Sequence, residues 1–214
     1  AQWQYVLPNK RKANPLSPIA ALEAKVADMA TDISLLRDMG YRNDAIMMQF
    51  DARNTSPAIP QGAIDLVITS PPYPNNYDYA DATRLEMTFW GEIAGWGDLQ
   101  GAVRRHIIRS CSQHAAAEKL ELEDLLADPV TLCIRTELAD VCHELAQVRL
   151  SHGGKKTYHT MIAAYFCDLG RVFLALRKLC SEGSRLCFVI GDSAPYGVYV
   201  PAERWLGELA LSAG

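Results

Sequence analysis

The sequence predicts an α/β domain built around a largely parallel sheet. Two segments, residues 63–69 and 185–190, are predominantly apolar and rich in β-branched side chains, as are parallel strands buried on both faces. Segments of helical periodicity separate and follow them, which is the element order of α/β domains. The chain of 214 residues is long enough for one sizeable core, so we expect a single domain over residues 1–214.

The first part of the chain predicts one helix, one strand and one loop. Residues 15–39 predict a helix, because apolar side chains recur at helical spacing and Gly40 follows the last of them. The apolar run at 45–50 ends at Asp51 and predicts a short buried strand. Two prolines within 55–62 indicate a surface loop.

The rest of the chain is predicted to be mainly helical. Residues 81–157 predict a helical insertion, and 158–180 predict a long helix with one apolar side. We expect a turn at 181–183 and a last helix at 201–213. We expect no membrane span, because no apolar run approaches the roughly twenty residues that a bilayer requires.

Composition and charge narrow the functional classes. With 49% hydrophobic and 21% charged residues, the chain is globular rather than disordered. Six cysteines without a Cys-x-x-Cys pair indicate free thiols, and therefore a reducing compartment such as the cytoplasm. The five histidines show no ligand spacing with cysteines or acids, so we expect no metal site. The net charge of −4 does not show the basic balance usual in nucleic-acid binders, but local basic clusters occur, so charge alone does not decide for or against nucleic acid.

The strand at 63–69 runs into the sequence Ser70-Pro71-Pro72-Tyr73. Consecutive prolines fix the backbone and lack N–H groups, so they form a rigid corner whose carbonyls find no partner in the sheet. Ser70 adds a hydroxyl and Tyr73 a flat face for stacking. This set suits a planar heterocycle with an exocyclic amino group; the simpler alternative is a turn in which Tyr73 only packs.

A second strand end is expected to join this corner. The strand at 185–190 ends at Gly191-Asp192-Ser193, and ligands of open α/β sheets bind beyond the carboxyl ends of strands. Both strand ends are therefore predicted to border one crevice. For Asp192 the alternative is a carboxylate that only caps a turn.

The corner resembles the catalytic motif (Asp/Asn/Ser)-Pro-Pro-(Tyr/Phe/Trp) of amino-group DNA methyltransferases that use S-adenosyl-L-methionine. The form Thr69-Ser70-Pro71-Pro72-Tyr73 is most similar to their cytosine-N4 branch. The resemblance implies a Rossmann-like methyltransferase domain with a mostly parallel sheet and a helical insertion. It also implies a site-specific DNA methyltransferase that acts on the exocyclic amine of a base flipped out of double-stranded DNA.

The same resemblance assigns roles to further residues. The segment around Phe50-Asp51-Ala52 and the segment starting at Asn14-Pro15 are similar to parts that contact the methyl donor. The residues implied in cofactor binding are Asn14, Asp51, Ala52 and Ser70. The catalytic residues implied are Ser70, Pro71, Pro72 and Tyr73, and the base pocket is implied to involve Tyr77, Tyr79, Asp192 and Ser193.

One expected part is missing. The family's donor loop, Phe-x-Gly-x-Gly or a relative, does not occur, and the order of the other parts puts it upstream of Asn14. We hypothesise that a segment between Lys12 and Ala13 is missing from the sequence. The helical insertion at 81–157 is then the segment expected to contact DNA.

Two alternatives stay open at this point. The substrate amine is cytosine N4 in the first interpretation, but adenine N6 or an RNA guanine amine suits the same corner chemistry. The other alternative is a catalytically inactive methyltransferase-like module that binds nucleic acid, for example beside a restriction or defence component. The absent donor loop favours that second class.

Overall fold

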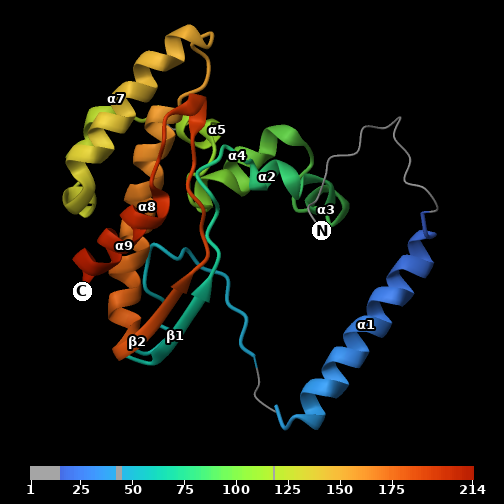
Figure 1. Cartoon of the computed structure of the whole chain (residues 1–214). Helices are drawn as coiled ribbons and strands as arrows, with labels where there is room; N and C mark the ends of the chain where they lie inside the picture. Colours follow the sequence, from blue (N-terminus) through green and yellow to red (C-terminus); the bar gives the residue numbers. More distant parts are fainter. Residues whose placement is uncertain (1–14, 42–44, 118) are drawn as a thin grey trace. The chain divides into compact units, whose positions relative to one another are not determined.

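The computed structural model describes residues 15–41, 45–117 and 119–214, in two compact units that divide between Met48 and Gln49 (Figure 1). The predictions that concern Asn14 and the junction of Lys12 with Ala13 lie outside the described residues. The prediction of a single domain over the whole chain stays a prediction.

The first unit contains helix α1 (Pro18–Asp38). Ser17 caps it, because its hydroxyl oxygen accepts a hydrogen bond from the Ala20 N–H at 3.2 Å, and Pro18 suits the first turn. The helix predicted over 15–39 is therefore confirmed. Its large apolar side chains are all exposed, since the described part of this unit offers no second element to cover them.

The second unit contains two parallel strands, β1 (Ile64–Thr69) and β2 (Cys180–Phe188). The pairs in register are Val67 with Leu186, Ile68 with Cys187, and Thr69 with Phe188. Near the start of β2 the register is irregular, and Gly183 there has a φ of +77°. The turn predicted at 181–183 is thus a bulge within a strand that begins earlier than expected.

Helices make up most of the second unit, as predicted. The helices between the strands are α2 (Tyr79–Ala82), α3 (Arg84–Phe89), η1 (Trp96–Asp98), α4 (Leu99–Ala102), η2 (Arg104–His106), α5 (Ser112–Ala117), α6 (Leu122–Ala127), η3 (Pro129–Ile134), α7 (Arg135–Ser151) and α8 (Tyr158–Leu179). After β2 come η4 (Pro195–Gly197) and α9 (Ala202–Ala213). The sequence therefore predicted the positions of α8 and α9 almost to the residue.

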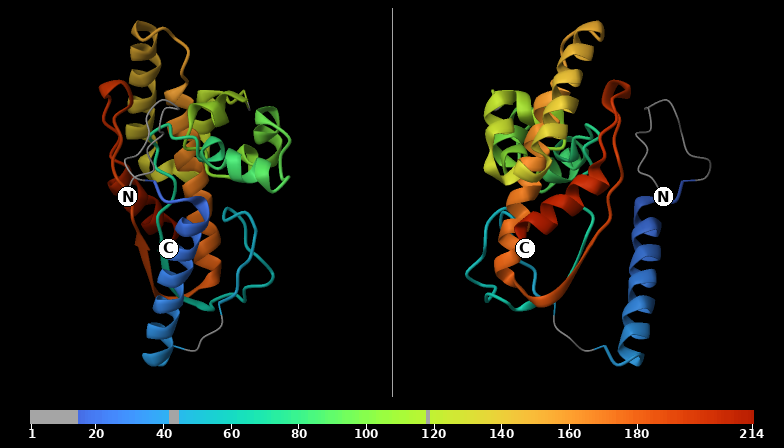
Figure 2. Two further views of the ribbon diagram at one scale, coloured as in Figure 1. Left: turned by 90° about the vertical axis from the view of Figure 1, so that its right-hand side faces the viewer. Right: turned by 60° about the vertical axis from the view of Figure 1, so that its left-hand side comes forward.

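The core is built around α8. Its side chains from Thr160 to Gly170 are all buried, and α7 and α9 pack against it. Both views of Figure 2 show α7 and α8 side by side. Phe166 of α8 meets Trp205 of α9 edge-on, with ring centroids 5.0 Å apart. A second, smaller core of Ala80, Ile93 and Leu99 lies in the segment that follows the corner.

The burial of α8 explains an unexpected property of its sequence. By length and composition its 22 residues are sufficient to cross a membrane, which our reading of the sequence did not anticipate. However, 78% of its most apolar window is buried inside the protein. That burial is typical of the central helix of a globular core.

Two expectations about strands are wrong in this structure. The run at 45–50 is irregular and pairs with no strand in the part of the chain that the structure describes. A strand requires a neighbour to complete its hydrogen bonds, and apolar composition alone does not supply one. The strands β1 and β2 were also expected to be buried on both faces, yet Leu66, Ile68 and Leu186 are exposed because no described layer covers them.

We predict that Gly170→Ala destabilises the second unit. A Cβ at this position would lie 2.7 Å from Cγ2 of Val130 and 3.3 Å from its carbonyl oxygen, so η3 and α8 must move apart. Overpacking of this kind costs about 1–3 kcal/mol. Urea unfolding followed by circular dichroism measures the loss.

The matched control is Gly207→Ala in α9, where a Cβ meets no atom within 4 Å. There alanine should leave stability unchanged or raise it by up to about 1 kcal/mol, because it favours helix over the unfolded chain. Equal effects of the two substitutions would contradict the packing of α8 on η3.

Candidate functional site

The two strand ends that were predicted to border one crevice do lie together. β1 leads into the Ser-Pro-Pro-Tyr corner (residues 70–73), and β2 leads into residues 189–193. Beyond the strands, the Val189 N–H still donates to the Thr69 carbonyl at 2.9 Å. The Ser193 hydroxyl donates to the Pro74 carbonyl at 2.7 Å, across 119 residues of sequence. Parallel pairing therefore assembles this site from two distant segments.

The Ser70 hydroxyl has a defined orientation. Its Oγ donates a hydrogen bond to the Val189 carbonyl at 3.0 Å, and the residue is exposed. A serine hydroxyl has one proton and two lone pairs, so a hydroxyl whose proton is used presents its lone pairs to other groups. Ser70 is therefore an oxygen acceptor at the surface of the corner.

The corner also keeps unpaired carbonyls, as the consecutive prolines predicted. Within the described residues, no hydrogen bond reaches the carbonyl of Pro71 or of Pro72. The ring of Pro71 is buried and anchors the corner, whereas Pro72 and Tyr73 are half-buried. The site thus combines a rigid backbone with acceptor oxygens that are not engaged by the protein.

Three tyrosines belong to the same segment as these oxygens. The Tyr73 ring faces the Gly191 position, where an added Cβ would be 3.9 Å from its Cε2. Tyr77 and Tyr79 form an edge-on pair with centroids 4.8 Å apart, and both are exposed. The three tyrosines follow one another along the segment that leaves the corner, which is where a stacking surface was predicted.

The carboxylate of Asp192 forms its hydrogen bonds with residues outside the corner. It accepts hydrogen bonds from the Glu203 N–H at 3.2 Å and from the Tyr199 hydroxyl, so it caps the start of α9. The Tyr199 hydrogen bond lowers the pKa of Asp192 below its ordinary value. No described contact joins this carboxylate to residues 70–73, and its role in a base pocket stays a prediction. The capping alternative accounts for its contacts.

Asp51 belongs to a charge network. Arg53 donates to both of its carboxylate oxygens, at 2.9 Å from Nε to Oδ1 and 2.8 Å from Nη2 to Oδ2. Arg53 also reaches Asp168 on α8 at 3.2 Å, and Arg109 binds the same carboxylate at 2.6 Å. The side-chain hydrogen bond from Arg53 holds the pKa of Asp51 below its usual range, although partial burial opposes this.

Asp51 lines a cavity of about 640 Å³. The other lining residues are mostly apolar, with His106 and Glu92 as the further ionisable groups. Ala52 is exposed beside it. None of residues 70–73 lines this cavity, so the structure does not bring Asp51 and Ser70 into one pocket, although both were predicted to contact the same cofactor.

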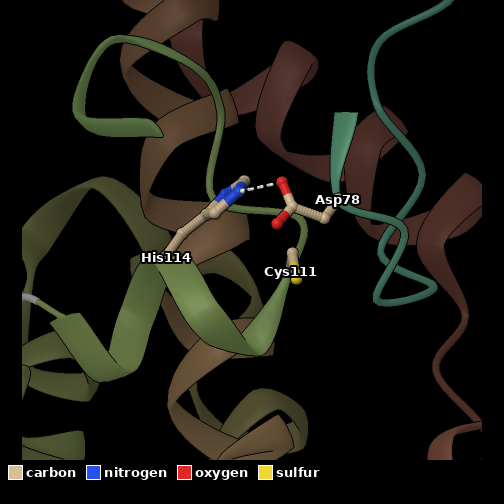
Figure 3. A group of neighbouring side chains, drawn as sticks. All are labelled: Asp78, Cys111 and His114. Carbon is tan, nitrogen blue, oxygen red and sulfur yellow. Dashed lines mark hydrogen bonds and ion pairs between the residues drawn. The ribbon is translucent and has the colours of Figure 1, made fainter. Parts of the chain in front are cut away.

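A third group of polar side chains lies directly after the corner. Asp78 caps α2, and its Oδ2 accepts two hydrogen bonds from Arg104, from Nη2 at 2.6 Å and from Nε at 3.2 Å. The fully buried His114 lies 3.4 Å from Oδ1, and Cys111 completes the group (Figure 3). Burial opposes ionisation of Asp78, but the hydrogen bonds from Arg104 and from the Asp81 N–H outweigh it, so its pKa is lowered. Burial also lowers the pKa of His114, against the effect of Asp78.

Sequence reasoning missed several of these residues. Asp168 is 1% exposed and binds two arginines, but an acid within an apolar helix gave no signal of its partners. The hydroxyl of Tyr165 is buried and has no hydrogen-bond partner among the described residues, and burial together with Tyr79 and Tyr73 raises its pKa far above the ordinary value. Cys111 and His114 are three residues apart, which places both side chains on one helical turn. The sequence analysis did not identify them as a ligand pair.

Trp90 and Trp96 are exposed side chains of the segment that follows the corner. Trp90 is 74% exposed and Trp96 is 52% exposed. The guanidinium of Arg104 lies 4.9 Å from the Trp96 ring centroid, so this ring makes a cation–π contact rather than filling a core. The small core of this segment consists of Ala80, Ile93 and Leu99 and does not include either indole ring.

Comparison with known proteins agrees with the resemblance carried by the corner. The chain is 25% identical over 192 residues to the type II methyltransferase M.BsoBI of Geobacillus stearothermophilus. It is 26% identical over 167 residues to the type II methyltransferases M.AvaI of Nostoc sp. and of Anabaena variabilis. No protein-family model and no solved structure matches the sequence.

These similarities cover most of this chain but a minor part of each relative. The match includes 86% of this chain and 38% of M.BsoBI, and 74% of this chain and 32% of M.AvaI. The chain therefore spans about a third of the length of the curated relatives it matches.

We predict that Asp51→Asn lowers stability at neutral pH and that the loss fades in acid. Because Arg53 depresses the pKa of Asp51, the carboxylate contributes stability above its unfolded pKa of about 3.9 and loses it as pH falls through the lower folded value. The expected difference from wild type is about 1 kcal/mol or less at pH 7, since the pair is partly exposed, and it should shrink between about pH 5 and 3.

Urea unfolding at three pH values measures this difference. Asp140→Asn is a suitable control, because that side chain is exposed and has no partner among the described residues. An Asp51→Asn deficit that stays constant down to pH 3 would show that the lost interaction is not ionic.

Proposed function

We propose that this chain is the catalytic part of a DNA methyltransferase that transfers a methyl group from S-adenosyl-L-methionine to an exocyclic base amine. The similarity to type II methyltransferases supports methyl transfer as the general activity. The observation that carries the proposal is the corner itself. Its Ser70 hydroxyl donates a hydrogen bond to the Val189 carbonyl, and its Pro71 carbonyl has no partner among the described residues, so the segment that ends in Tyr73 offers two acceptors.

These acceptors fit the chemistry of an aromatic amine. Such an amine is a poor nucleophile, because its lone pair is delocalised into the ring. Hydrogen bonds from its two N–H groups to Ser70 Oγ and to the Pro71 carbonyl oxygen direct these hydrogens out of the base plane and turn the lone pair toward an electrophile. Because both oxygens are fixed by the fold before the base arrives, little reorganisation is needed during reaction.

Tyr73 holds the base in this position. A base extruded from a duplex loses its stacking neighbours, and a tyrosine face replaces part of that energy, at about 1–3 kcal/mol per base. Tyr77 and Tyr79, which are exposed in the same segment, extend the aromatic surface toward DNA. We assign Ser193 to the wall of this pocket, because its hydroxyl binds the Pro74 carbonyl and ties the two strand ends together.

The residues near Asp51 fit the methyl donor in part. When bound, S-adenosyl-L-methionine supplies an electrophilic methyl carbon. The cavity of about 640 Å³ is of ligand size. The Asp51 carboxylate has about four acceptor positions and accepts four hydrogen bonds from Arg53, so a polar group of a ligand would replace or share one of them. We propose that Asp51 and Ala52 bind the donor there, within a Rossmann-like domain.

We further propose cytosine N4 as the acceptor amine, from the similarity of the serine-containing corner to that branch. Adenine N6 requires the same two acceptors, so the shape of the pocket distinguishes them. Residues 81–157, which we propose as a DNA-contacting insertion, carry the exposed Trp90 and Trp96. A cognate restriction or defence component fits the type II relatives.

We predict that Ser70→Ala lowers kcat by about 10²-fold, the scale on which the loss of one preorganised polar group acts. Affinity for DNA should change little, because the target amine is the one DNA group that the hydroxyl is proposed to contact. Tyr73→Ala should weaken both turnover and DNA binding, since it removes the stacking face. Tyr73→Phe is the matched control and should retain most activity, because the ring is kept.

Single-turnover kinetics and fluorescence anisotropy with a labelled duplex separate the two effects. Circular dichroism verifies that each variant is folded. Unchanged turnover in the Tyr73→Ala protein would contradict the assignment of the corner as the base pocket.

The activity itself is tested by incubating the chain with unmethylated DNA and radiolabelled S-adenosyl-L-methionine, followed by digestion to nucleosides. N4-methylcytosine is the expected product. N6-methyladenine would retain the proposed reaction and change the base. If no label is incorporated and calorimetry detects no donor binding while DNA is still bound, the chain is a nucleic-acid-binding module without catalysis.

A further inference from the structure

Three potential metal ligands converge beside the proposed base pocket (Figure 3). One oxygen of Asp78, the thiol of Cys111 and one imidazole nitrogen of His114 all lie within 4.8 Å of one another. Asp78 comes from the start of α2, and the other two come from the turn that enters α5. Cys111 and His114 are 1% and 0% exposed, so the group is shielded from solvent on the α5 side.

We propose that Asp78, Cys111 and His114 bind one divalent metal ion of the zinc class. Thiolate, imidazole and carboxylate are the three ligand types that Zn²⁺ takes in proteins, and they are mixed here in one small volume. Ions that prefer oxygen, such as Mg²⁺ and Ca²⁺, are disfavoured, because two of the three ligands are sulfur and nitrogen. This assignment replaces the expectation, drawn from sequence spacing, that the chain has no metal site.

The distance between His114 and Asp78 suits two ligands of one metal ion better than it suits a direct hydrogen bond. The 3.4 Å between His114 Nε2 and Asp78 Oδ1 is long for a hydrogen bond. It equals the edge of a tetrahedron, about 3.4 Å, whose corners lie about 2.1 Å from a central Zn²⁺. The thiol of Cys111 lies within 4.8 Å of the ligand atoms of both residues and 3.7 Å from Asn76 Oδ1.

The groups around Asp78 fix the orientation of its carboxylate. Residues outside the coordination shell fix metal-binding carboxylates in the same way. Arg104 Nη2 binds Oδ2 at 2.6 Å, so that Oδ1 is the oxygen directed toward His114. The turn that carries Cys111 is fixed in the same way, because Asn76 Oδ1 accepts from the Ser112 N–H at 2.8 Å. Ligands that are held in place by such contacts bind metal more tightly.

A second observation points to a missing partner. His114 is fully buried, and its Nδ1 has no hydrogen-bond partner in the described part of the chain. The adjacent segment also contains the buried Ser110 hydroxyl, which is likewise unpaired. Buried polar atoms without partners are rare in folded proteins. An ion on Nε2 would not reach Nδ1 on the opposite side of the ring; it would fix the tautomer that carries the proton on Nδ1.

The position of this site gives the ion a structural task. Asp78 lies between Tyr77 and Tyr79, and an ion that ties it to α5 would fix both rings relative to the corner. Three protein ligands leave one coordination position for water. The site does not include residues 70–73, and the metal assignment does not depend on the proposed methyl transfer.

Cobalt substitution tests the proposal on the intact chain. Purified, metal-stripped protein is titrated with Co²⁺ and then with Zn²⁺ under reducing conditions. One equivalent of Co²⁺ should produce the ligand-field bands of a tetrahedral site and a thiolate-to-cobalt charge-transfer band, which Zn²⁺ then abolishes. Zn²⁺ should also raise the Tm of the wild-type protein. Absence of the charge-transfer band in the wild-type protein overturns the proposal without any variant.

Variants then locate the site. Cys111→Ser should abolish the charge-transfer band, and His114→Gln should weaken Co²⁺ binding at least about tenfold. The matched control is the double variant Cys133→Ser, Cys187→Ser, which removes the two exposed thiols and should bind Co²⁺ as the wild type does. A band that survives Cys111→Ser, or that disappears in the exposed-thiol variant, assigns the metal to surface cysteines and overturns the proposal.

Discussion

The parallel pairing of β1 with β2 is the constraint on which the candidate site depends. The two strands come from opposite ends of the second unit, and their pairing aligns Thr69 with Phe188. The contact between the Ser70 hydroxyl and the Val189 carbonyl follows from this register. A shift by one residue would present the other face of β2 and would leave the hydroxyl without this acceptor.

The buried helix α8 helps to keep the two strands in this arrangement. It ends at Leu179 and β2 begins at the next residue, so the packing of the helix fixes where the second strand starts. Phe173 of α8 lies 5.1 Å from Phe188 of β2 between ring centroids, close to the strand end that carries the site. Asp168 of the same helix binds Arg53 and Arg109, and Arg53 in turn holds Asp51. One helix therefore positions both the corner and the charged network near the cavity.

The segment after the corner carries a high density of polar contacts for its length. Asp78 at the start of α2 is bound by Arg104, by two backbone N–H groups and by His114. Such a buried charge is stable only while its partners stay in place, because an unpaired buried carboxylate is costly. The contacts of Asp78 therefore also fix the backbone of its neighbours Tyr77 and Tyr79, although the rings of both tyrosines are exposed. This combination of rigid backbone and accessible rings is what stacking on a ligand requires.

The sequence alone determined the local features of this protein. Helical periodicity located α1, α8 and α9, and the chemistry of serine and consecutive prolines indicated a rigid corner with free acceptors before any contact was known. These features depend on residues that are close together in the chain. Tertiary structure decided the rest: Asp168 meets Arg53 across 115 residues, Asp78 meets Arg104 across 26, and the run at 45–50 forms no strand because no neighbour pairs with it. Charges and strands can pair only when distant segments of the chain come together. The packing of α8 determines which segments meet, and the local sequence does not.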